Sequence, residues 1–260
     1  MQTRHKQHIA AALICLVCTG TVFANALLDD HFDNGNLATG GGGLNGGFQV
    51  NSSAGQSISG TATESGTSVT ITEGSGEAEG ITSLSSVSLA RDCKVEWQVA
   101  SVTHIGRPLC RTMYGLQGAN NTWALNVTSH PAVLVQLYPA ENRAYLTLNA
   151  PDGTVKNQAS QSFSNLYITD PDGYTITAEF TRQGYTITSV GRNTLYSEQL
   201  NLSGNWDTTG AFTYDNLFGT ENLYAAAYVQ EGNNTQTAIL ALDRITVTDQ
   251  SLKGTVIMIQ

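Results

Sequence analysis

Apolar and polar residues alternate along most of this chain. In residues 95–99, Val, Trp and Val alternate with Glu and Gln, and residues 176–180 repeat the pattern with Ile, Ala and Phe. Such alternation places apolar side chains on one face of a β-strand and polar side chains on the other. Further strands are expected at 68–72, 122–127, 132–138, 144–149, 185–190, 223–228 and 239–247. No amphipathic stretch with a helical period is long enough to predict a helix, so the pattern predicts an all-β protein.

Turn sequences separate the expected strands. Pro-Asp-Gly occurs at 151–153 and again at 171–173, and Gly-Asn-Asn occurs at 232–234. These residue types favour turns. A glycine-rich segment, 35–47, is expected to form a long loop after the first strand. About a dozen short strands predict two antiparallel sheets packed face to face in one domain, residues 27–260.

The N-terminus departs from this pattern. Basic residues at 4–8 precede an apolar run over 9–23, which is followed by Ala-Asn-Ala at 24–26. This is the arrangement of a secretory signal peptide, and the run is too short to span a bilayer as a helix. A retained membrane anchor is the alternative. We therefore expect residues 1–26 to be cleaved and the mature protein to be secreted, either extracellular or periplasmic or at the cell surface, with no membrane insertion after cleavage.

The charge of the chain narrows the class of partner. The formal net charge is −9, and loss of Arg4 and Lys6 with the leader makes it −11. Nucleic acids and anionic membranes need clustered Lys and Arg, and the sequence has no such cluster. Only 13% of the residues are charged, so Thr, Ser, Asn and Gln must form most of the surface. Such a surface suits neutral polar ligands.

Two cysteines, Cys93 and Cys110, remain after leader removal. In an exported protein the expected arrangement is one disulfide, which here would close a loop of about 17 residues and contribute about 3 kcal/mol. A metal site would need more ligands, and only His104 lies between the two cysteines. We therefore predict a Cys93–Cys110 disulfide.

The two ends of the mature chain resemble a known superfamily. Leu-Asp-Asp-His-Phe-Asp-Asn-Gly at 28–35 and Leu-Asp-Arg-Ile-Thr-Val at 242–247 look like the terminal strands of concanavalin A-like lectin/glucanase domains. They are also similar to the laminin-G-like domains of exported bacterial surface proteins. The resemblance implies a jelly-roll sandwich whose first and last strands pair side by side.

The resemblance also implies a structural calcium ion. In glucanase-type members, a late Asp holds this ion together with backbone carbonyls, and Asp243 stands at that position, with Asp30 and Asp33 as further candidates. Oxygen ligands of this kind suit calcium. Asp243 shares strand parity with Ile245, so it is expected to point toward the core, where a carboxylate needs a partner. Pairing with Arg91, Arg244 or a backbone amide is the alternative.

Catalytic motifs of the superfamily are missing from the sequence. Retaining glucanases carry Glu-x-Asp-x-x-Glu on one strand, with two carboxylates about 5 Å apart. Here the nearest pair, Glu77 and Glu79, lies among glycines and is interpreted as loop decoration. Jelly-roll lyases use Arg, Gln, His and a late Tyr; residues 224–230 resemble their last motif faintly, but no Gln-x-His strand precedes them. We expect no catalysis, with an atypical hydrolase or lyase as an alternative.

Binding residues are sought among aromatics in polar settings. Sugar-binding proteins stack pyranose rings on aromatic faces and flank them with Asn, Asp and Gln. Asn205, Trp206 and Asp207 form such a group in a polar turn, although loop packing also explains the indole. Tyr114 and Asn121 are expected on a concave face. The sequence thus predicts a protein that binds a neutral glycan or surface-matrix proteins, or alternatively a structural subunit of an extracellular assembly.

Overall fold

The computed structural model describes residues 26–40, 44, 46–52, 61–73, 78–88, 92–103, 111–119, 130–164, 173–191, 198–219, 222–230 and 238–250. The predicted leader lies at residues 1–26, of which 1–25 are outside the described residues, and it stays a prediction. Within the described residues, no helix is long and apolar enough to cross a membrane.

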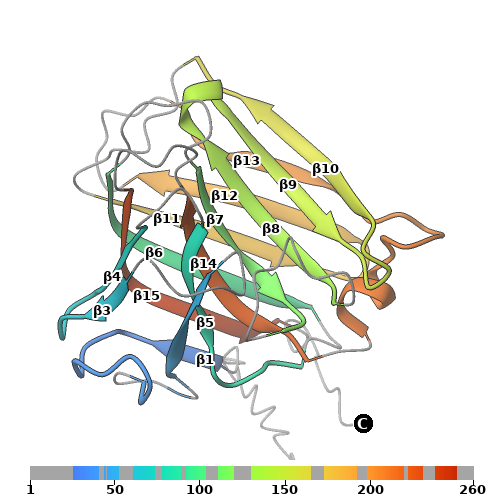
Figure 1. Ribbon diagram of the computed structural model, residues 1–260. Helices are drawn as coiled ribbons and strands as arrows, with labels where there is room; N and C mark the ends of the chain where they lie inside the picture. Colours follow the sequence, from blue (N-terminus) through green and yellow to red (C-terminus); the bar gives the residue numbers. More distant parts are fainter. Residues whose placement is uncertain are drawn as a thin grey trace, which may run out of the picture.

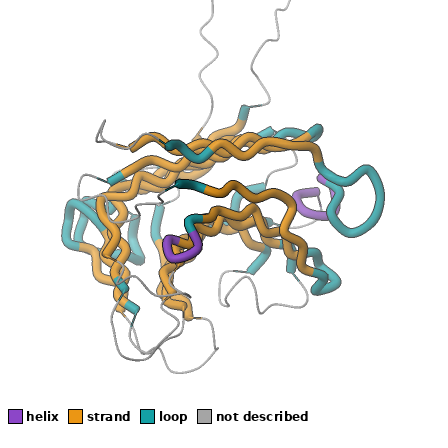
Figure 2. Tube along the Cα trace, turned by 90° about the horizontal axis from the view of Figure 1, so that it is seen from above, coloured by secondary structure: helices purple, strands orange, loops and turns teal. Residues whose placement is uncertain are grey.

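Two antiparallel sheets pack face to face in the described structure (Figures 1 and 2), which confirms the predicted all-β sandwich. The eight-stranded sheet has the order β13-β12-β11-β6-β15-β4-β3, with β1 also beside β15. Its strands are β13 (Asn201–Asn205), β12 (Gly184–Gly191), β11 (Tyr174–Phe180), β6 (Cys93–Thr103), β15 (Ile239–Asp249), β4 (Val69–Thr72), β3 (Thr61–Glu64) and β1 (Ala26–Asp30).

The second sheet has seven strands in the order β10-β9-β8-β7-β14-β5-β2. Its strands are β10 (Val155–Ser162), β9 (Arg143–Asn149), β8 (Ala132–Tyr138), β7 (Arg111–Gln117), β14 (Tyr224–Gln230), β5 (Ala78–Ser83) and β2 (Phe48–Ser52). Two short helices complete the described elements: the 3-10 helix η1 (Pro139–Glu141), between β8 and β9, and the π-helix η2 (Asp215–Gly219), after β13.

The inward positions of both sheets form one hydrophobic core, as the alternation predicts. Val95, Trp97 and Val99 of β6 are fully buried, while the residues between them are partly exposed. The ring of Trp97 lies 6.1 Å from that of Tyr114 on the facing sheet, and its Nε1 donates to the carbonyl oxygen of Ala226 at 3.2 Å. The core therefore joins the centre of β6 to β7 and β14.

The first and last strands pair, as the resemblance implies. Leu28 of β1 lies opposite Val247 of β15. Strand β15 carries a bulge opposite β6. Leu242 pairs with Val99 and Arg244 with Gln98, which leaves Asp243 as the extra residue. The bulge switches the buried face from even to odd positions, and Asp243 is half-buried. The prediction that Asp243 points toward the core stays a prediction.

The predicted disulfide is absent from the described residues, where Cys93 is a buried free thiol; Cys110 lies outside them. Cys93 begins β6 at the end of the sandwich near Trp206. Its pairing with Cys110 stays a prediction.

Candidate functional site

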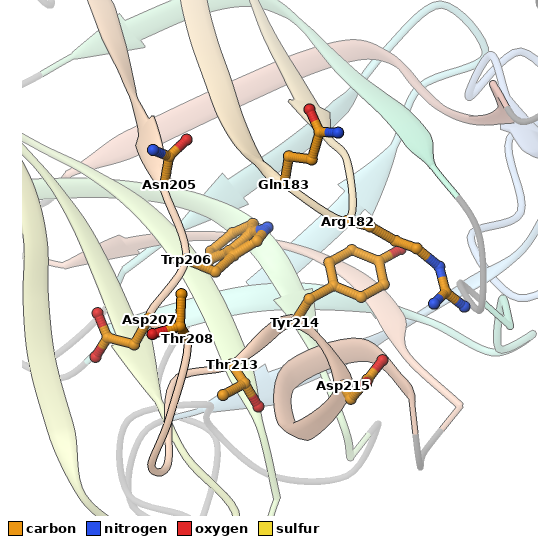
Figure 3. Close-up of a pocket in the computed structure, with 9 residues that line it drawn as sticks. All are labelled: Arg182, Gln183, Asn205, Trp206, Asp207, Thr208, Thr213, Tyr214 and Asp215. Carbon is orange, nitrogen blue, oxygen red and sulfur yellow. The ribbon is translucent and has the colours of Figure 1, made fainter.

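A cavity of about 610 Å³ lies beside the turn between β11 and β12, where the chain leaves β13 toward η2 (Figure 3). Three of the predicted ligand-binding residues meet here. The lining residues are Arg182, Gln183, Asn205, Trp206, Asp207, Thr208, Thr213, Tyr214 and Asp215. A pocket of this volume is of the size that small ligands occupy.

Trp206 forms the floor of the cavity rather than an exposed platform. Its side chain is 5% exposed, and its Nε1 donates to the carbonyl oxygen of Thr181 at 2.7 Å. Its ring centroid lies 5.1 Å from that of Tyr185 and 5.4 Å from that of Phe218. Of the two interpretations of this indole, the structure favours loop packing.

Tyr214 lies next to Trp206 on the floor, 6.4 Å away between ring centroids. Burial raises the pKa of its hydroxyl well above the ordinary value, and the nearby Cys93 and Asp92 raise it further. The hydroxyl therefore stays protonated at neutral pH and acts as a hydrogen-bonding group, not as a base. The guanidinium carbon of Arg182 lies 6.0 Å from the centre of the ring.

The rim of the cavity carries polar side chains of several kinds. Asn205, Gln183 and Asp215 are exposed, and Figure 3 shows them spread around the aromatic floor. Asp207 accepts two hydrogen bonds from Lys156 Nζ on β10, at 2.8 and 2.9 Å. Amide and carboxylate groups around aromatic rings can hydrogen-bond to the hydroxyls of a sugar.

The other predicted binding residues lie elsewhere. Tyr114 is fully buried between the sheets, where its hydroxyl lies 2.7 Å from that of Tyr174. Tyr114 lies on the same face of β7 as the buried Leu116, so it is not on the concave surface where the sequence predicted it. Asn121 lies outside the described residues.

The three predicted calcium ligands have different surroundings. Both oxygens of the buried Asp30 accept backbone N–H bonds, from Phe32 at 2.9 Å and from Gly47 at 2.7 Å. Asp33 is exposed, and Asp243 sits at the bulge of β15. Within the described ranges, no three His, Cys, Asp or Glu side chains are grouped to hold an ion. The calcium ion that the resemblance implies stays a prediction.

Glu79 also differs from its interpretation as loop decoration. It lies within β5, is fully buried and shares strand parity with the buried Ile81, so it faces the other sheet. Glu77 is outside the described residues. The sequence of β5, Ala-Glu-Gly-Ile-Thr-Ser, has no clear apolar face, and this is why the strand was not predicted.

A polar cluster on the outer face of the seven-stranded sheet was missed by sequence reasoning. Arg111 Nε donates to Gln230 Oε1 at 2.6 Å, and its Nη1 donates to Gln136 Oε1 at 2.7 Å and to the hydroxyl of Tyr138. Gln136 Nε2 in turn donates to Thr147 Oγ1 at 2.6 Å. Strand parity could have placed these residues on one face, but only with the order β14-β7-β8-β9 in hand.

Comparisons with known proteins identify the fold. No protein-family model matches the sequence, and no curated protein matches it. Among solved structures, arcelin-5, a lectin-like defence protein from Phaseolus vulgaris, is 7% identical with a TM-score of 0.57 over 78% of this chain and 92% of its own. Lectin I-B4 from Griffonia simplicifolia is 11% identical, with a TM-score of 0.56 over 77% and 92%.

The exoplasmic/lumenal domain of VIP36, solved with Ca²⁺ and Man3GlcNAc bound, is also similar. It is 9% identical, with a TM-score of 0.54 over 82% of this chain and 84% of its own. At these identities the likeness concerns the fold. The chain has the concanavalin A-like jelly-roll fold of the legume lectin-like structures, as the resemblance of its ends implies.

Proposed function

We propose that this protein is an exported, non-catalytic glycan-binding protein and that a neutral sugar binds in the cavity beside Trp206. The observation that carries the proposal is the arrangement of the cavity, in which Asn205, Gln183 and Asp215 surround a floor of two aromatic rings. The lectin-like fold supports it, since structures with this fold include one solved with Man3GlcNAc bound.

The cavity has a volume in the range that small ligands occupy, and its rim is polar. Sugar recognition needs hydrogen-bonding groups that reach the sugar hydroxyls. Asn205 and Gln183 supply both donors and acceptors through their amides. The Lys156–Asp207 ion pair fixes the position of the rim against β10, so the site is held between the edges of both sheets.

A glycan array tests the proposal. The full-length chain is expressed with its leader, the secreted product is purified, and neutral oligosaccharides are screened for binding and for release of reducing ends. We expect at least one neutral glycan to bind without product. Asn205→Ala should weaken binding about tenfold, since it removes hydrogen bonds worth about 1.4 kcal/mol.

Asn201→Ala is the matched control, because Asn201 is exposed on the same strand and does not line the cavity. It should bind as the parent protein does. No binding to any neutral glycan, or equal binding by the two variants, would overturn the proposal, and so would release of product.

A further inference from the structure

Two tyrosines and two arginines form a strip on the outer face of the seven-stranded sheet, beside η1. The strip consists of Arg111 on β7, Tyr138 on β8, and Arg143 and Tyr145 on β9, and we call it the tyrosine–arginine strip. Tyr138 and Tyr145 meet edge to face, with ring centroids 5.4 Å apart. Arg111 and Arg143 each lie over one of these rings, at 5.3 Å from Tyr138 and 5.8 Å from Tyr145.

The tyrosine–arginine strip is exposed to solvent on the outer face of the seven-stranded sheet. Along the same face the central positions of the sheet are buried: Met113 and Tyr228 are at most 1% exposed, and so is Leu134. The four strip residues, by contrast, are partly or fully exposed. A ligand that reaches this end of the outer face therefore meets aromatic rings and guanidinium groups first.

The strip differs in charge from the acidic chain around it. Among the described basic residues, Lys94, Lys156 and Arg244 form ion pairs with carboxylates. Arg143 forms no ion pair in the described ranges; one of its N–H groups donates to the Tyr145 hydroxyl at 3.1 Å. A guanidinium has five N–H donors in a planar fork that matches the oxygens of a carboxylate or a sulfate.

From these observations we propose that the tyrosine–arginine strip is a second glycan-binding site and that it takes a sugar bearing an oxyanion. The pyranose ring packs against the solvent-exposed parts of Tyr138 and Tyr145, and the carboxylate or sulfate receives hydrogen bonds from Arg143. Arg111 on β7 adds positive charge. Hydrogen bonds to Gln136 of β8 and Gln230 of β14 hold its side chain in place.

This site is separate from the cavity beside Trp206. Lys156, which pairs with the cavity residue Asp207, lies opposite Leu148 on β9, whereas Arg143 begins that strand. Five residues of extended strand correspond to about 17 Å. In Figure 1, η1 stands at the top of the β8–β9 hairpin and η2 lies near its opposite end. The second site therefore does not depend on the first.

One neighbouring group opposes the bound anion. The exposed Glu141 of η1 accepts a hydrogen bond from the Tyr145 hydroxyl at 3.1 Å, so its negative charge lies close to the strip. Neutralising it should favour an anionic ligand. Glu141→Gln keeps an oxygen that can accept this hydrogen bond, which makes it a clean change of charge.

The test measures binding of the full-length secreted protein to three probes: oligogalacturonate for carboxylate, dextran sulfate for sulfate, and unmodified dextran for the neutral backbone. We expect one or both anionic probes to bind more tightly than dextran, and to bind more weakly as salt is raised. Arg143→Gln should weaken anionic binding at least tenfold, and Glu141→Gln should strengthen it severalfold. The probe that loses affinity in Arg143→Gln identifies the oxyanion.

Lys94→Gln is the matched control, because Lys94 is a partly exposed basic residue on β6 of the other sheet and does not line the cavity. It should leave anionic binding unchanged. Equal binding by Arg143→Gln and the parent protein overturns the proposal, as does failure of both anionic probes to bind. So does self-association, detected by size exclusion, that Arg143→Gln abolishes without any anionic binding. Failure of Asn205→Ala to change neutral glycan binding bears on the cavity alone.

Discussion

Arg244 donates two hydrogen bonds of 2.8 Å to the carboxylate of Asp29, from Nε to Oδ1 and from Nη2 to Oδ2. Asp29 lies on β1 and Arg244 on β15, so this bidentate pair ties the first strand to the last. His31 adds a weaker contact, with its Nε2 3.3 Å from Asp29 Oδ2. The ion pair therefore stabilises the pairing of β1 with β15.

The pair makes stability depend on pH. Burial alone would raise the pKa of Asp29, but the hydrogen bond and positive charge of Arg244, followed by those of His31, hold it below its ordinary value. Because the folded pKa lies below the unfolded one, about 4, the stabilisation is present above that pH and is lost as pH falls through the folded pKa. Asp29→Asn should cost about 1 kcal/mol in urea unfolding at neutral pH.

The same substitution should cost less at about pH 2 than at neutral pH, because the parent carboxylate takes up a proton as the pH falls through its folded pKa. Asp33→Asn is the control, since Asp33 is exposed nearby and should change stability little at either pH. An equal cost of Asp29→Asn at both pH values would contradict the role assigned to the charge.

Asp30 is expected to act as a structural clamp rather than as a calcium ligand. It is fully buried, and it accepts hydrogen bonds from the amides of Phe32, which precedes the glycine-rich loop, and of Gly47, which ends it. Asp30→Ala should destabilise the protein by about 2–3 kcal/mol, because two buried amides lose their acceptor. Chemical unfolding in calcium and in a chelator should show the same loss; a loss seen only with calcium would reinstate the metal site.

Residue patterns were sufficient for strands with one clear apolar face and insufficient for the others. The strand at 132–138 was predicted with the observed bounds. β10 was missed because its alternating positions are nearly all polar, and it is held as an edge strand by pairing with β9. For the site, the polar turn around Trp206 was a sound signal. Tyr114 was misplaced because its face depends on which sheet covers β7.

Cys93 should be unreactive in the folded protein. It is 1% exposed, and burial followed by the charge of Asp92 raises the pKa of its thiol far above the ordinary value. Since the thiolate is the reactive form, iodoacetamide should not label Cys93 in the native state. In denaturant without reductant it should be labelled fully, as read by peptide mass. A label that appears only after reduction would establish the disulfide that the sequence predicted.

Replacing Trp206 should separate packing from binding. Because the indole is buried among Phe180, Tyr185 and Phe218, Trp206→Ala should cost about 3–5 kcal/mol of stability. Trp206→Phe keeps part of the ring contact but removes the hydrogen bond to Thr181 and some ring volume, so it should cost less, about 1–3 kcal/mol. Chemical unfolding measures both values, with Asn205→Ala as the rim control that should change stability little.

Glycan affinity gives the second half of this test. If Trp206 is the floor of the cavity, Trp206→Phe should change the affinity for a neutral glycan less than threefold, whereas Asn205→Ala should weaken it about tenfold. The reason is that the 5% of Trp206 left exposed offers little surface for a sugar ring to stack on. A Trp206→Phe variant that keeps its stability but loses binding would show instead that the indole turns outward to hold the ligand.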